Sequence, residues 1–171
     1  MKWSYSIAGQ LSWVNLLYEA INEAIVLPLY FFMGQAVSDR KEYTNRIRSG
    51  LLVSLGIYTL CSVLVMIFVH PLLRFMAVSQ DILPESAIYI RIECVANIFG
   101  ILYSFICVAL ITIGKDKLVY VITAAKLILS LLLDTLLISI LPVSLNCGVN
   151  GIGISNIISN LILFLISASL I

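Results

Sequence analysis

The side chain best placed to do chemistry is an acidic one in an apolar segment. Asp134 lies in the run Ile128–Ile140, where the other polar residues are Ser130, Thr135 and Ser139. Ser130 precedes Asp134 by four residues, so both share one face of a helix. An ionisable group at membrane depth is costly and usually faces a bundle interior or a wet cavity. Ser130 and Asp134 therefore predict a site for a coupling cation or proton. The alternative is a structural aspartate hydrogen-bonded within a helix interface.

Lys126 lies on the same helix face, two turns before Asp134. The two residues are about 12 Å apart along a helix axis, too far to pair directly. Lys126 lies nearer the cytoplasmic end of its helix, toward which its ammonium could snorkel.

A second acidic group lies in the first apolar segment, where Glu19 and Glu23 are four residues apart and Asn15 is on the same face. These three residues, with Lys126, are candidates for lining a polar cavity. The alternative is that the two glutamates pair with Arg91 or Lys126 and hold the bundle together. Arg91 itself, with Glu93, is expected near the outer end of the third segment, where interfacial water would solvate both.

The last apolar segment carries small residues at helical spacing. Gly151, Ser155 and Ser159 recur every four residues, a pattern that lets a neighbouring helix approach closely. We expect these residues to serve helix packing. Asn156 and Asn160 form an adjacent polar stripe that could reach a coupling ion.

No catalytic motif accompanies these residues. The sequence contains no Walker A motif, GxSxG elbow or HExxH motif, and its four cysteines include no CxxC pair. We therefore expect no enzyme activity, no catalytic residues, no metal centre and no cofactor other than a coupling Na⁺ or H⁺. The net charge of +1 gives no sign of a nucleic-acid partner.

The composition explains what must position these side chains. Of 171 residues, 61% are hydrophobic and 11% charged, with a mean hydropathy of +1.10, and a soluble domain of this size has far more polar surface. The sequence thus predicts an all-α integral membrane protein in the lipid bilayer. Five segments are long enough to span: 11–34, 51–69, 87–113, 118–141 and 151–171.

Connections between these segments differ in charge. The first, Ser38–Arg48, and the third, Gly114–Lys117, hold most of the lysines and arginines. Alternating helices place both on one side, which the positive-inside rule assigns to the cytoplasm. We therefore expect a multi-pass protein of a bacterial inner (plasma) membrane with the N-terminus outside. An outside N-terminus without a signal peptide suggests a helix upstream of this chain. The second connection is expected to begin at His70-Pro71.

The order of motifs resembles the MATE family, the multidrug and toxic compound extrusion transporters. The resemblance rests on the loop Gly34–Val37, the turn Gly114–Lys117, the pair Ser130 and Asp134, and the segment Gly148–Asn156. It implies a twelve-helix fold in two lobes, of which residues 1–171 would form helices two to six of the first lobe. The partners would then include the missing first helix and second lobe of the same transporter.

The resemblance also implies a function. Members export cationic or amphipathic, drug-like small molecules in exchange for Na⁺ or H⁺. An aspartate at the position of Asp134 belongs to the ion site in one branch, and Asn156 falls where a threonine contributes. Ser130 replaces the usual asparagine, Lys115 stands where aspartate is common, and Glu19 and Glu23 match no family pattern.

Two other functions remain open. One is a lipid-linked oligosaccharide flippase of the same superfamily, which would place several basic residues in its cavity, whereas Lys126 is the only deep one here. The other is a truncated membrane protein that does not transport and acts through helix association.

Overall fold

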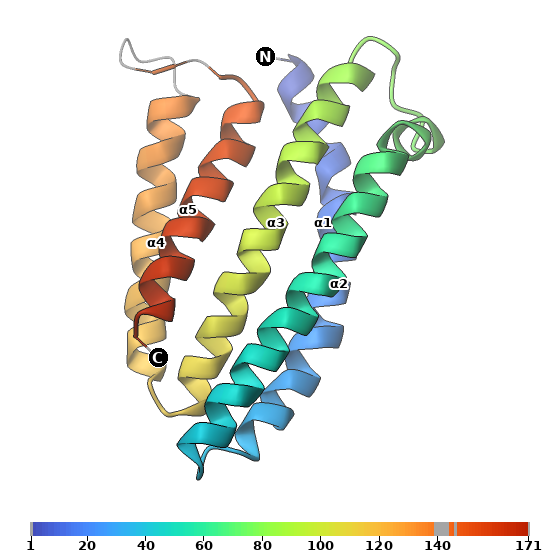
Figure 1. Cartoon of the computed structure of the whole chain (residues 1–171). Helices are drawn as coiled ribbons and strands as arrows, with labels where there is room; N and C mark the ends of the chain where they lie inside the picture. Colours follow the sequence, from blue (N-terminus) through green and yellow to red (C-terminus); the bar gives the residue numbers. More distant parts are fainter. Residues whose placement is uncertain (1, 139–143, 146, 171) are drawn as a thin grey trace.

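The computed structural model describes residues 2–138, 144–145 and 147–170, with side chains from Ser12 onward in these ranges (Figure 1). These residues form five helices, which confirms the predicted all-α fold. The helices are α1 (Lys2–Gly34), α2 (Arg40–Phe75), α3 (Leu83–Thr112), α4 (Asp116–Leu137) and α5 (Asn150–Ala168).

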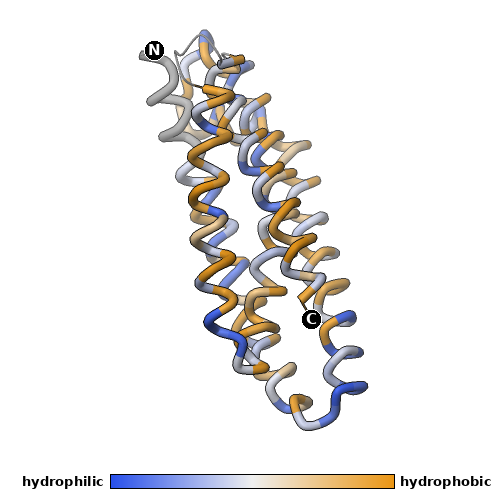
Figure 2. Tube along the Cα trace, turned by 90° about the vertical axis from the view of Figure 1, so that its left-hand side faces the viewer, coloured by the Kyte–Doolittle hydropathy of each residue, from blue (hydrophilic) through white to orange (hydrophobic). Residues whose placement is uncertain are grey.

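All five helices are long and apolar enough to cross a membrane, with the span in α1 running from Ser12 to Gly34. They alternate in direction, so the α1–α2 and α3–α4 connections lie at the same end of the bundle, opposite the start of α1 (Figure 1). Hydrophilic residues gather at that end, and hydrophobic ones dominate the middle of the helices (Figure 2). The two basic connections therefore share one side, as the sequence predicts.

The boundaries of α2 differ most from the prediction. The stretch Ser38–Arg48, expected as a connection, is helical from Arg40, because the Asp39 carboxylate accepts hydrogen bonds from the backbone N–H groups of Lys41 (2.8 Å) and Glu42 (3.3 Å). The prediction that the second connection begins at His70-Pro71 was also wrong. Pro71 lies inside α2, and the last turns of α2 bend away from the axis of the rest of the helix (Figure 1).

The other boundaries lie closer to the expected ones. Helix α3 begins at Leu83, four residues before the predicted start at residue 87, and α4 ends at Leu137. The predicted ends of the fourth and fifth helices, residues 139–141 and 171, lie outside the described residues. The earlier start of α3 matters for the site, because it moves Glu93 away from the helix end.

Helix α3 is the centre of the bundle, packing most extensively against α5 and α2 and also contacting α1 and α4. Close approach to α2 depends on Gly50, since a Cβ atom there would lie 2.6 Å from the Phe105 ring. Nearby, the Tyr43 hydroxyl of α2 donates a 2.6 Å hydrogen bond to the carbonyl of Ala109 in α3. These contacts fix α2 and α3 as one unit.

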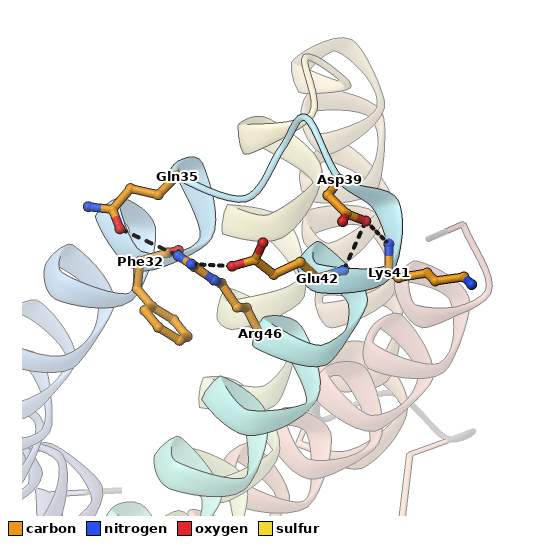
Figure 3. A network of polar contacts seen from close by, with 6 residues as sticks. All are labelled: Phe32, Gln35, Asp39, Lys41, Glu42 and Arg46. Atoms are coloured by element: carbon orange, nitrogen blue, oxygen red, sulfur yellow. Dashed lines mark hydrogen bonds and ion pairs between the residues drawn. The ribbon is translucent and has the colours of Figure 1, made fainter.

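A polar network closes the end of the bundle where α1 meets α2 (Figure 3). The Arg46 guanidinium pairs with Glu42, donates to the backbone carbonyl of Phe32 and the side chain of Gln35, and lies 4.6 Å from the centre of the Phe32 ring. At the same end, the Lys115 ammonium donates to the carbonyl of Leu170 at 2.8 Å. Two basic residues thus satisfy free carbonyls near the ends of α1 and α5.

Candidate functional site

A polar cavity of about 310 Å³ lies within the apolar bundle, and every helix contributes to its wall. Polar groups lining a cavity at membrane depth are the expected mark of a substrate or ion path. The lining residues are Asn15, Tyr18, Glu19, Asn22, Tyr58, Glu93, Ala96, Asn97, Gly100, Ile101, Ser104, Lys126, Asn156 and Asn160.

The longest part of this wall is one face of α3. Glu93, Asn97, Gly100 and Ser104 follow at intervals of four, three and four residues, which aligns them along a helix. Glu93 lies ten residues after Leu83, about 15 Å along the axis at about 1.5 Å per residue. The expectation that Glu93 is solvated at the outer end of the helix is therefore wrong.

Glu93 is the most deeply buried carboxylate among the described residues, with 4% of its surface exposed. Its Oε1 accepts a 2.9 Å hydrogen bond from Nδ2 of Asn156 in α5, and the Tyr89 hydroxyl of α3 interacts with the same carboxylate. Gly153 allows this approach, because a Cβ atom there would lie 2.6 Å from Cγ2 of Ile92 and 3.6 Å from Oε1 of Glu93.

Asn160 lies one turn further along α5 and is almost as deeply buried. Its Nδ2 donates to the carbonyl of Ala96 at 3.1 Å, whereas its Oδ1 has no hydrogen-bond partner. A Cβ atom on Gly100 would lie 3.3 Å from Nδ2 of Asn160, so the glycine gives this amide room. Asn160 thus lines the cavity and carries a buried acceptor without a partner.

Two tyrosines form the opposite wall. The Tyr18 and Tyr58 rings lie 5.7 Å apart, and the Tyr58 hydroxyl donates to the backbone carbonyl of Tyr18 at 3.1 Å. The Tyr18 hydroxyl is hydrogen-bonded to Oγ of Ser62 at 2.8 Å, and Ser62 donates to the carbonyl of Cys94. This chain of bonds fixes α1 and α2 to α3 beside the cavity.

The Lys126 ammonium does not extend toward the end of its helix. Lys126 lines the cavity, and its ammonium lies 4.8 Å from the centre of the Tyr103 ring, close enough for a cation–π contact. The lysine thus brings a positive charge to the wall formed by α3 and α4.

The three residues assigned to ion coupling, Ser130, Asp134 and Asn156, each have a different partner. Ser130 donates to Oγ of Ser159 at 3.3 Å, and Asn156 donates to Glu93. Asp134 lies half-buried in the last turn of α4, does not line the cavity, and has Tyr89 as an electrostatic neighbour. Tyr89 therefore interacts with both Glu93 and Asp134.

The acidic residues of α1 also separate. Asn15 and Glu19 line the cavity, whereas Glu23 is exposed and is not part of its wall. Within the described side chains the one ion pair is that of Arg46 with Glu42, so neither glutamate pairs with a cation there.

The small residues of α5 lie where this helix meets α4. A Cβ atom on Gly151 would lie 3.0 Å from Cγ1 of Ile138, and Ser159 bonds to α4 through Ser130. Ser155, one turn from each, is fully buried.

Some side chains that line the cavity were not predicted from the sequence. Asn97 and Ser104 continue the stripe from Glu93, and their offsets of four and eleven residues were a usable signal. Tyr18 and Tyr58 gave none, since tyrosines in apolar helices are usually packing residues. No group of three or more metal-ligating side chains occurs in the part of the chain that the structure describes.

Comparison with known families and proteins gives one result. The family model named MatE matches residues 30–136, which include most of the bundle from the end of α1 to the last turn of α4. No curated protein and no solved structure matches the chain. With more than half of its length matched, the chain belongs to the MatE family of multi-helix membrane transporters.

Proposed function

We propose that this chain is part of a secondary antiporter that exports cationic or amphipathic small molecules in exchange for Na⁺ or H⁺. The observation that carries the proposal is the polar cavity, to which all five helices of a MatE-family bundle contribute. Polar side chains are costly inside a membrane bundle, so a bundle without a ligand or ion path would not be expected to gather this many of them around one cavity.

The charges of the cavity favour a cationic substrate over a pyrophosphate-linked one. The described wall carries two carboxylates, Glu19 and Glu93, and one ammonium, that of Lys126. A flippase for lipid-linked oligosaccharides needs several cations for its diphosphate, and this wall offers one. The balance supports drug-like cations as the exported class.

Asp134 is our candidate for the coupling residue, with Ser130 and Asn156 as further oxygen and amide groups. Its support is its acidic side chain, half-buried in the last turn of α4 beside Tyr89, which also interacts with Glu93. Binding of Na⁺ or H⁺ at Asp134 would change the electrostatic environment of Tyr89 and, through Tyr89, that of Glu93 in the cavity wall. An ion that binds one state better than the other shifts the balance between inward- and outward-open forms.

In this proposal the chain acts as helices two to six of a first lobe, which would rock against a second lobe to give alternating access. The basic α1–α2 and α3–α4 connections would face the cytoplasm of a bacterial cell. The first helix and the second lobe are then partners of this bundle.

The test is drug efflux by the full-length transporter carrying Asp134→Asn. Efflux should be abolished while expression and membrane insertion stay at the wild-type level. Asp116→Asn, an exposed carboxylate in the first turn of the same helix, is the matched control and should transport normally. Efflux retained by Asp134→Asn would remove Asp134 as the coupling residue.

Expression of the 171-residue chain alone tests the non-transporting alternative. If this chain is one lobe of the antiporter, it should give no drug resistance by itself and should regain it when the rest of the transporter is supplied. Resistance from the isolated chain would contradict the two-lobe proposal.

A further inference from the structure

The strongest unexplained feature of the molecule is a buried carboxylate without a cation. Glu93 is 4% exposed, and the groups that contact it, Asn156 and Tyr89, are neutral. No lysine or arginine among the described side chains pairs with it. An ionised carboxylate in such a place is costly unless a charge of opposite sign joins it. Glu93 therefore needs a proton or a cation that the described side chains do not supply.

Unused acceptors on the same wall point to the same kind of ligand. Asn160 is 8% exposed, and its Oδ1 lacks a donor. Across the cavity, Oδ1 of Asn22 in α1 is buried and also lacks a donor. Buried oxygens are almost always satisfied, so acceptors left without a donor on residues that line a cavity point to a ligand. Carboxylate and amide oxygens are the groups that hard cations prefer.

The remaining unpaired group on this wall fits a ligand as well. Nδ2 of Asn97 is buried without an acceptor, and a half-turn of this amide would present its oxygen in the same place. Asn97 can thus add either an oxygen for the cation or a donor for a water molecule that accompanies it.

Charge and size set the class of cation. Two carboxylates and one ammonium leave the described wall with one negative charge, which suits a monovalent ion. The Lys126 ammonium is held over the Tyr103 ring. A volume of about 310 Å³ exceeds that of a bare metal ion and accommodates a small organic ammonium group or an alkali ion with water.

We infer that Glu93, Asn160 and Asn22 form a binding site for a monovalent cation, separate from Asp134. The cation is either Na⁺ or the ammonium head of an organic substrate, since both present the same chemistry to these oxygens. The site lies in the cavity of the proposed antiporter, so its role in transport rests on the proposed function. Its occupancy can nevertheless be measured without transport.

The experiment is a binding titration of the purified full-length protein in detergent, with Na⁺ and tetramethylammonium as separate probes in a buffer free of other small cations. Glu93→Gln keeps an oxygen for Asn156 but removes the charge. Asn160→Leu keeps the volume and removes Oδ1. Glu85→Gln, an exposed glutamate in the first turn of α3, is the matched control.

We expect Glu93→Gln to weaken binding by about tenfold or more, as befits loss of a charged contact, and Asn160→Leu to weaken it by less. Glu85→Gln should bind as the wild type does. Saturable binding of Na⁺ alone identifies an ion site, binding of tetramethylammonium alone identifies a substrate site, and competition between the two identifies a shared site. Each of these results supports the inference if Glu93→Gln and Asn160→Leu weaken the binding.

The inference is overturned if the wild type binds neither probe, or if Glu93→Gln binds as tightly as the wild type. Size-exclusion profiles of each variant show whether the fold is retained, and Asn160→Leu decides the question if Glu93→Gln does not fold. Efflux measured in parallel separates the two proposals. If the protein exports drugs but binds neither probe, only the cation site is ruled out. If it binds a probe through Glu93 but exports nothing, only the antiport function is ruled out.

Discussion

Asn156 of α5 donates a hydrogen bond from Nδ2 to Oε1 of Glu93 in α3, at 2.9 Å, across the most extensive helix contact of the bundle. This bond joins the cavity wall to the packing of the helices that form it. A change in the charge of Glu93 would therefore be transmitted directly to the α3–α5 contact.

A double-mutant cycle tests whether the Glu93–Asn156 bond has this role. Glu93→Ala and Asn156→Ala should each lower the thermal unfolding midpoint, and the double variant should lose less than the sum of the two. We expect a coupling energy of about 0.5–3 kcal/mol, the range for residues in direct contact. Additive losses in thermal unfolding would show that the two side chains act independently.

Gly153 should tolerate no larger residue. In Gly153→Ala the new Cβ atom would lie 2.6 Å from Cγ2 of Ile92, so α5 must move away from α3. We expect a loss of about 1–3 kcal/mol in stability, measured by thermal unfolding in detergent. Gly56→Ala in α2 is the control, because its Cβ atom meets nothing within 4 Å. Equal behaviour of the two variants would contradict the close α3–α5 contact.

Lys126 should tune the affinity of the cavity for cations. Lys126→Met keeps most of the side-chain length but removes the positive charge, so tetramethylammonium should bind several-fold more tightly. Lys126→Arg keeps both the charge and the contact with the Tyr103 ring and should bind as the wild type does. An unchanged dissociation constant in Lys126→Met would mean that its charge does not reach the ligand.

Cysteine labelling can determine the orientation of the chain. Cys147 is exposed on the α4–α5 connection, whereas Cys94 and Cys107 are buried. If the basic connections face the cytoplasm, a membrane-impermeant maleimide should label intact cells through Cys147 and should fail with Cys147→Ser. Labelling that requires permeabilised cells would reverse the orientation.

The sequence by itself determined the class of the protein and the outline of its fold. An excess of apolar residues in five long segments leaves membrane helices as the available structure, because every backbone group must find its hydrogen bond within the span. The alternation of those helices places the two connections that are rich in lysine and arginine on one side of the bundle (Figure 1). Spacing also placed Asn15 and Glu19 on one helix face, and both line the cavity.

Tertiary structure decided which polar residues meet. Spacing along a helix shows that Ser130 and Asp134 share a face, but it does not show how α4 is rotated or which neighbour that face contacts. In the bundle this face brings Ser130 to Ser159, while Asn156 turns to Glu93. The position of Glu93 depended on a helix start four residues earlier than hydropathy suggested, because Pro84 and Glu85 are not hydrophobic but suit the first turn of a helix. Helix rotation is set by packing between segments distant in sequence, and it turned Glu93, rather than Asp134, toward the cavity.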